Sequence, residues 1–425
     1  MHPYTLLFLV ALAATTAMRL WLQQRQLQAL AAHRDRVPEP FSAVVTAAEH
    51  RRAADYNRDG IRLARLQLLY GTALLLAVTL GGGFAALDAA AGRLGWPAPW
   101  DGVATLTLLA LGLGLANLPF SLYDTFVVEA RHGFNRTTPA LYAADLARSL
   151  ALGLVLGVPL LALLLWLMTI AGPAWWLYAW AAWAAFLLAL QFAWPRFIAP
   201  LYNRFRPLEA GPLRDRVDAI VRRCGFAADG VYVMDGSRRS SHGNAYFTGF
   251  GRHKRIVLYD TLVERLDADE VEAVLAHELG HFRLKHVRTM VLVGLAVAFA
   301  GFAVLGWLAA QPAFYAALGV PEPSPHAALA LFVLASPAFT YFLDPLETLW
   351  SRHNEYAADR YAAEHADGQR LADALVKLHR DNASTLTPDP LYSAWYYSHP
   401  PALERIAALR ASVPAAGSAA PVAAR

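Results

Sequence analysis

The sequence contains a single cysteine, Cys224, which excludes an internal disulfide and any cysteine-based metal cluster. Lysine is almost as scarce and occurs only at Lys254, Lys285 and Lys377, so most of the basic residues are arginines. No basic block with interleaved aromatic residues is present, and nucleic acid is therefore not an expected partner. Any metal site in this chain must take its ligands from histidine, glutamate and aspartate.

Charge of either sign is also sparse, because only 16% of the 425 residues are charged while 56% are hydrophobic and 12% aromatic. A soluble protein of this length rarely has so few charges. Seven apolar segments are long enough to span a bilayer: 3–22, 66–90, 103–122, 150–170, 175–194, 290–310 and 327–343. The composition therefore predicts a mainly α-helical, multi-pass membrane protein in contact with lipid.

The first apolar segment lacks the preceding positive charge that a secretory signal peptide would have, so we expect it to be retained as a helix. Several arginines follow it, including Arg25, Arg34 and Arg36. By the positive-inside rule the N-terminus then lies outside, and seven spans place residues 196–287 and the C-terminus inside. The excess of arginine over lysine favours a bacterial source, and hence the bacterial inner membrane with this region on the cytoplasmic side.

Residues 196–287 form the one long polar stretch, and its pattern predicts both helices and short strands. A helix is expected at 213–224, closed by Gly225. Asp267 and Glu270 have the spacing of a capping box at the start of another helix. The remaining expected elements are strands at 230–235, 244–249 and 255–259, and helices at 349–364 and 369–381 after the last apolar segment.

The capped helix carries the sequence H-E-L-G-H at 277–281. Histidines four apart project from one face of a helix, so His277 and His281 can bind one Zn²⁺ together. Glu278 lies beside that face, where it can polarise a metal-bound water and carry its proton. The pattern predicts metal-assisted hydrolysis.

A catalytic zinc usually has three protein ligands and one open position, so a third ligand is needed. Val287 occupies the place where one class of zinc proteases has a third histidine, which excludes that class. The alternative is a glutamate from a later helix, and Glu355 is the best candidate. Asp359, one turn further on, can accept a hydrogen bond from the non-ligating nitrogen of a zinc histidine. We expect one Zn²⁺ per chain, bound by His277, His281 and Glu355.

Further motifs occur in a fixed order along nearly the whole chain: His132-Gly133-Phe134-Asn135, Ile198 to Asn203, Asn244-Ala245-Tyr246, Glu355 to Asp359, Tyr397-Ser398-His399-Pro400-Pro401 and Glu404-Arg405. With these motifs the sequence resembles the type I CAAX prenyl proteases, which are integral-membrane zinc endopeptidases. The resemblance implies seven transmembrane helices around a large water-filled intramembrane chamber, together with a small α+β zinc-protease domain.

The resemblance also implies roles for single residues. Asn244, Ala245 and Tyr246 would belong to an edge strand that pairs with the substrate backbone. His399 would donate a hydrogen bond to the oxyanion of the tetrahedral intermediate. Arg405 would be a supporting ion-pair residue and not a substrate contact.

Along the chain this organisation predicts five segments. They are an N-terminal transmembrane region of five spans (1–195), a soluble zinc-protease segment with the H-E-x-x-H helix (196–287), two further spans (288–347), a C-terminal helical segment with the third zinc ligand (348–410) and a disordered tail (411–425).

Three functions stay open. The first is a CAAX-type endopeptidase acting on a peptide or protein substrate, prenylated or membrane-associated. The second is a quality-control metalloprotease that cuts misfolded membrane proteins. The third is a non-catalytic membrane scaffold or transporter with a structural zinc, although such a zinc normally has four ligands and does not need Glu278. The sequence sets neither the cleavage specificity nor the oligomeric state.

Overall fold

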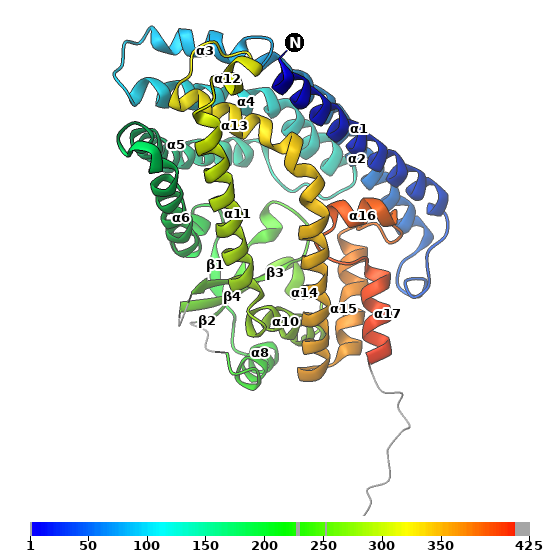
Figure 1. The fold of residues 1–425 in the computed structure, drawn as a ribbon. Helices are drawn as coiled ribbons and strands as arrows, with labels where there is room; N and C mark the ends of the chain where they lie inside the picture. Colours follow the sequence, from blue (N-terminus) through cyan, green and yellow to red (C-terminus); the bar gives the residue numbers. More distant parts are fainter. Residues whose placement is uncertain (1, 227–229, 251–252, 413–425) are drawn as a thin grey trace, which may run out of the picture. The chain divides into compact units, whose positions relative to one another are not determined.

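The computed structural model describes residues 2–226, 230–250 and 253–412 (Figure 1). Of the predicted disordered tail, residues 413–425 lie outside the described part of the chain, whereas residues 411 and 412 end a helix. The chain forms two compact units. The helix unit comprises Met1–Leu27, Arg58–Tyr202 and Arg288–Asp344, and the sheet unit comprises Gln28–Asn57, Asn203–Val287 and Pro345–Arg425. Thus residues 28–57, which the sequence assigns to the N-terminal transmembrane region, belong to the sheet unit.

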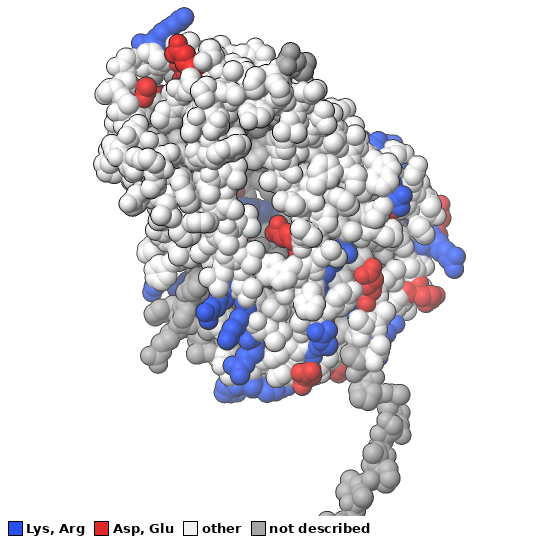
Figure 2. All heavy atoms as spheres, viewed as in Figure 1, with Lys and Arg blue, Asp and Glu red and all other residues white. Residues whose placement is uncertain are grey.

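The described residues contain seven helical stretches that are long and apolar enough to cross a membrane, which confirms the predicted number. They are Pro3–His33, Ala47–Val78, Trp100–Glu129, Pro139–Ile170, Gly172–Tyr202, His286–Ala309 and Pro325–His365. Helices satisfy their backbone hydrogen bonds internally, as a segment in lipid must. Large apolar side chains on them are exposed, such as Leu115 at 70% and Val297 at 67%. In Figure 2 the surface of α5 (Pro139–Ile170), α6 (Trp175–Ala193) and α11 (His286–Ala309) is almost free of charged side chains, as lipid contact requires.

The helix unit is built from α1 (Pro3–His33) and α2 (Ala47–Val78), both of which continue into the sheet unit, and from the helices that follow. These are α3 (Gly83–Gly92), α4 (Trp100–Tyr123), α5 (Pro139–Ile170), α6 (Trp175–Ala193), α7 (Ala199–Tyr202), α11 (His286–Ala309), α12 (Pro312–Ala317) and α13 (Pro325–Thr340). Short π-helical turns extend α4 and α6 at Asp124–Glu129 and Trp194–Ile198. A buried apolar cluster that includes Phe8, Phe84, Leu165 and Leu331 packs this unit.

The second predicted span, 66–90, is wrong in its bounds, because α2 starts earlier and ends at Val78. The chain turns at a run of three glycines, and Gly82 has a positive φ of 75°. A Cβ atom at Gly81 or Gly83 would come within 2.7 or 2.8 Å of the Ala77 carbonyl oxygen. Only glycine permits such a tight reversal, so a continuous helix through this run is replaced by two helices.

The sheet unit contains a four-stranded sheet in the order β1-β2-β4-β3. The strands are β1 (Phe205–Pro207), β2 (Gly230–Met234), β3 (Ala245–Phe250) and β4 (His253–Tyr259). β2 and β4 are parallel, whereas β1 and β3 pair antiparallel with their neighbours, so β3 is an edge strand. The three predicted strands are confirmed. β1 was not predicted, because three residues that include Arg206 and Pro207 show no alternation, and a proline is tolerated only at such an edge.

Helices complete the sheet unit: α8 (Pro212–Arg223), α9 (Asp260–Val263), α10 (Ala268–Arg283), α14 (Asp344–His365), α15 (Gly368–Asp381), α16 (Pro390–Tyr396) and α17 (Ala402–Ser412). α10 contacts α8 and α15, and α15 contacts α17. Ile256 and Leu258 of the sheet, Leu275 and Leu279 of α10, and Ile406 of α17 share one buried apolar core. This core holds α10 in place within the sheet unit.

The start of α10 has the predicted capping box. The Asp267 carboxylate accepts a hydrogen bond from the Glu270 backbone N–H at 3.0 Å, and the Glu270 carboxylate accepts one from the Asp267 backbone N–H at 2.9 Å. Two N–H groups that a helix start leaves without partners are thereby satisfied.

Candidate metal centre

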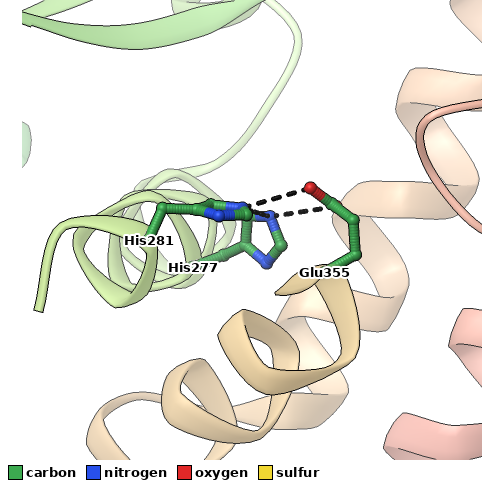
Figure 3. Close-up of side chains that lie close together, drawn as sticks. All are labelled: His277, His281 and Glu355. Carbon is green, nitrogen blue, oxygen red and sulfur yellow. Dashed lines mark hydrogen bonds and ion pairs between the residues drawn. The ribbon is translucent and has the colours of Figure 1, made fainter. Parts of the chain in front are cut away.

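Side chains of α10 and α14 converge on one point inside the sheet unit (Figure 3). The Nε2 atoms of His277 and His281 are 3.2 Å apart. The Glu355 carboxylate faces both of them, with Oε2 3.4 Å from His277 Nε2 and Oε1 3.2 Å from His281 Nε2. One nitrogen or oxygen atom from each residue lies within 4.8 Å of the others. The structure thus brings together the three predicted ligands.

Gly280 explains how α10 and α14 come close enough. A Cβ atom at this position would lie 3.2 Å from the Ala358 Cα atom and 3.2 Å from the Tyr361 Cβ atom, both on α14. Two small residues facing each other therefore allow the helices to approach. Gly280 lies between the two metal-site histidines, where the H-E-x-x-H pattern leaves the residue free, so the motif gave no signal for this packing role.

The donor set fits a cation. Glu355 is buried, and its Oε2 atom has no hydrogen-bond partner among the described residues. His277 Nδ1 lies 2.8 Å from Asp359 Oδ1, so this nitrogen carries a proton when the imidazole is neutral, and the Nε2 lone pair then faces Glu355. Two imidazole nitrogens and one carboxylate are the ligand set of many catalytic zinc sites, which keep a fourth position open. His277, His281 and Glu355 therefore fit a catalytic metal.

Asp359 and Arg405 form a buried ion pair behind this cluster. Arg405 donates to both oxygens of Asp359, from Nη2 at 2.6 Å and from Nε at 2.9 Å, and its Nη1 lies 3.4 Å from Glu355 Oε2. Both side chains are nearly fully buried, at 2% exposure for Asp359 and 5% for Arg405. Because Arg405 belongs to α17, this ion pair connects a third helix, besides α10 and α14, to the three candidate metal ligands.

The carboxylates raise the proton affinity of the first histidine. Burial alone would lower the pKa of His277, but the nearby carboxylates of Asp359 and Glu355 raise it to about 9. A raised pKa means that a metal must compete with a proton for this histidine. The adjacent Glu278 has a pKa raised above its ordinary value by burial, which suits a carboxylate that must accept a proton and release it again.

His399 lies at the same site, in the segment between α16 and α17. Its Nε2 atom is 3.4 Å from Glu355 Oε1, and its side chain is 63% exposed, so it can reach a ligand that approaches from solvent. Arg352 of α14 donates to the backbone carbonyls of Tyr397, at 3.2 Å, and of Ser393. This arginine thereby ties the segment that carries His399 to the helix that carries Glu355.

The three predicted substrate-strand residues lie at the start of the edge strand. Asn244 is exposed, and its carbonyl accepts a hydrogen bond from the Tyr259 N–H at 3.0 Å. Ala245 is buried and faces Leu258. The Tyr246 hydroxyl points to Met234 Sδ at 3.9 Å, and burial raises its pKa to about 12. The Tyr246 ring therefore packs within the sheet, and the backbone of β3 is the part that faces outward along the free edge.

From the sequence, His286 is expected only as a surface or supporting residue, because a zinc with three protein ligands does not need it. Its Nδ1 atom lies 3.1 Å from Nδ1 of His281. In a continuous helix, residues five apart point in different directions, so the spacing alone could not predict this contact.

Comparison with known proteins gives one consistent result. The family model described as "CAAX prenyl protease N-terminal, five membrane helices" matches residues 26–204, and the model for peptidase family M48 matches residues 207–413. The chain is 34% identical to the "CAAX prenyl protease 1 homolog" of Oryza sativa subsp. japonica, over 88% of this chain and 90% of that protein. It is 31% identical to the Caenorhabditis elegans homolog, over 95% and 98%. The crystal structure of S. mikatae Ste24p matches with a TM-score of 0.89 and 31% identity, over 96% of this chain and 99% of that one.

Proposed function

The chain belongs to the CAAX prenyl protease family of M48 peptidases and is an integral-membrane metalloprotease, and from this and the geometry of its site we propose that it is a zinc endopeptidase with His277, His281 and Glu355 as ligands. The observation that carries the proposal is the buried Glu355 carboxylate facing two imidazole Nε2 atoms. Three protein ligands leave the fourth coordination position of a zinc ion open for water, and Glu278 is next to the ligands in sequence. The structural zinc of a non-catalytic scaffold would instead have a fourth protein ligand.

Each residue of the site then has its own role in peptide-bond hydrolysis. When bound, zinc supplies Lewis acidity toward a water molecule and the scissile carbonyl. Glu278 takes the proton of the attacking water and returns it to the leaving amine nitrogen. His399, exposed and next to Glu355, donates a hydrogen bond to the oxyanion. Asp359 holds His277 in the tautomer that leaves Nε2 free, and Arg405 holds Asp359.

The substrate is a peptide or protein whose backbone adds to the free edge of β3 at Asn244, Ala245 and Tyr246. Main-chain pairing provides affinity for any extended segment and is insensitive to its side chains. The relatives' name, CAAX prenyl protease, motivates the proposal that a prenylated C-terminal segment is the preferred substrate. The water-filled chamber that the resemblance implies, and the position of the site on the cytoplasmic side of a bacterial inner membrane, belong to the same proposal.

The test is the Glu278→Gln protein, purified with its zinc content measured. The amide cannot accept the water's proton, so cleavage of a peptide substrate should fall by several powers of ten while about one zinc per chain is retained. His399→Ala should be milder, at roughly 10²–10³-fold. Glu364→Gln, an exposed acid near the end of α14, is the matched control and should leave the rate unchanged. Wild-type cleavage by a zinc-loaded Glu278→Gln protein would disprove the mechanism.

The substrate proposal needs a separate pair of peptides, identical in sequence and differing only in a farnesyl group on the cysteine. A higher kcat/KM for the prenylated peptide supports it. Equal values for the two peptides would leave the protease assignment intact and remove the prenyl preference.

A further inference from the structure

The two histidine ligands differ in the group that faces their Nδ1 atom, the ring nitrogen that points away from the metal site. His277 Nδ1 faces a carboxylate, that of Asp359, at 2.8 Å. His281 Nδ1 faces another imidazole, with His286 Nδ1 at 3.1 Å. The rings of His281 and His286 meet edge to face, with centroids 5.2 Å apart and planes at 71°. This distance is that of a hydrogen bond between the two ring nitrogens.

A hydrogen bond between two Nδ1 atoms needs exactly one proton on the pair when both rings are neutral, and this leaves two arrangements. If His286 donates, the proton of neutral His281 must sit on Nε2, the atom that faces His277 and Glu355 at 3.2 Å, and a metal cannot bind there. If His281 donates, its Nε2 lone pair is free for a metal. Only the second arrangement is compatible with His281 as a ligand.

The backbone at the end of α10 creates this contact. In a continuous helix, residues 281 and 286 would point about 140° apart around the axis. Here α10 ends at Arg283, and Lys285 adopts a positive φ of 63° before α11 begins at His286. A non-glycine residue rarely adopts this conformation. The break redirects the chain so that His286 returns to the face of α10 that carries His281.

We propose that His286 is a positioning residue for the metal site: its Nδ1 atom accepts a hydrogen bond from Nδ1–H of His281 and so holds His281 in the metal-binding tautomer and orientation. This inference rests on the proposed ligand set. His286 is not itself a fourth ligand, because among the described residues the ligand atoms that gather within 4.8 Å of one another belong to His277, His281 and Glu355. The two ligand histidines are thus oriented by different groups, a carboxylate and an imidazole.

The experiment compares His286→Leu with His286→Asn in the full-length protein. Leucine removes the acceptor. Asparagine places an oxygen, Oδ1, on the same branch as the imidazole Nδ1, and this oxygen can only accept. His365→Leu is the matched control, because His365 is also a histidine of the sheet unit but lies ten residues, or about 15 Å, along α14 from Glu355.

Two readouts besides activity are measured: the affinity for Zn²⁺ by competition with a chelator, and the visible spectrum of the protein loaded with Co²⁺. We expect His286→Leu to weaken zinc binding about 10–100-fold and to alter the Co²⁺ spectrum. His286→Asn should recover most of the affinity and the wild-type spectrum, and His365→Leu should match wild type. Equal losses in the leucine and asparagine variants would mean that the acceptor does not matter, and would overturn the proposal. So would wild-type affinity in His286→Leu.

His281→Ala separates this failure from that of the proposed metal site. If His281→Ala weakens zinc binding while His286→Leu does not, the ligand set stands and the positioning role is wrong. If His281→Ala leaves zinc binding unchanged, the ligand set itself is wrong and the inference about His286 falls with it.

Discussion

His277 Nδ1 lies 2.8 Å from Oδ1 of Asp359, and the other nitrogen of the same ring faces Glu355. The ring is thus held between two carboxylates of one helix, four residues apart. One carboxylate is a proposed ligand, and the other orients the ring.

The first prediction concerns Asp359→Asn. A neutral amide is a weaker acceptor for the imidazole N–H and no longer pairs with the Arg405 guanidinium, so we expect zinc affinity to fall about 10–100-fold. Chelator competition measures this. Glu364→Gln, an exposed charge-removing change on the same helix, should bind zinc like wild type. An Asp359→Asn protein with wild-type affinity would remove Asp359 from the supporting residues.

The second prediction is a pH dependence. The pKa of His277 in the metal-free protein is raised to about 9 by its two carboxylate partners, against the effect of burial. Zinc must displace the proton on Nε2, so binding releases a proton below that pKa, and acid weakens binding. The apparent affinity should therefore rise from pH 6 to about pH 9 and then level off. In Asp359→Asn the plateau should begin at a lower pH. An affinity that is flat from pH 6 to 9 would contradict the prediction.

The third prediction concerns the buried Arg405. Replacing it by leucine leaves the carboxylates of Asp359 and Glu355 without their cation in a buried site, and breaking a buried pair in this way costs about 3–5 kcal/mol. The melting temperature of purified Arg405→Leu should drop clearly below that of wild type. Arg410→Leu removes an exposed arginine from the same helix and should change it little. Similar melting temperatures for both variants would show that the pair is not stabilising.

The sequence predicts His277, His281 and Glu355 because their signal is local: two histidines one turn apart, and an acid in a later helical motif. The Arg405–Asp359 contact could not be derived from spacing, because it depends on how the fold brings Arg405 next to Asp359 across 46 residues of chain. The contact between His286 and His281 was not predicted, because the positive φ of Lys285 has no sequence signal. The end of α2 was mispredicted for a different reason: hydropathy continues through Leu80 to Ala90, and it outweighed the three glycines that stop the helix.

The fourth prediction concerns membrane topology. With the N-terminus outside, the turn after α3 lies outside and α17 lies inside. In a Cys224→Ala background, Arg93→Cys should react with an impermeant thiol reagent in intact cells, and Ala408→Cys should react only after the membrane is opened. Both positions are exposed in the structure, so the folded protein itself does not shield either cysteine from the reagent. Labelling of Ala408→Cys in intact cells would reverse the charge-based orientation.

The fifth prediction compares two glycines of α11. A Cβ atom at Gly306 would lie 2.8 Å from the Trp176 ring of α6, whereas at Gly294 no atom lies within 4 Å. The two helices pack closely through aromatic contacts, since Phe299 of α11 meets the Trp176 ring edge to face at 5.3 Å. An added methyl group at Gly306 would overpack this contact, which costs about 1–3 kcal/mol because α11 or the Trp176 ring must move.

Gly306→Ala should therefore lower the melting temperature of the protein in detergent, while Gly294→Ala should leave it unchanged or slightly higher, since alanine favours helix. Zinc content should be the same in both, because the proposed ligands all belong to the sheet unit. If the two variants melt alike, Gly306 is not the contact that allows α11 to approach α6.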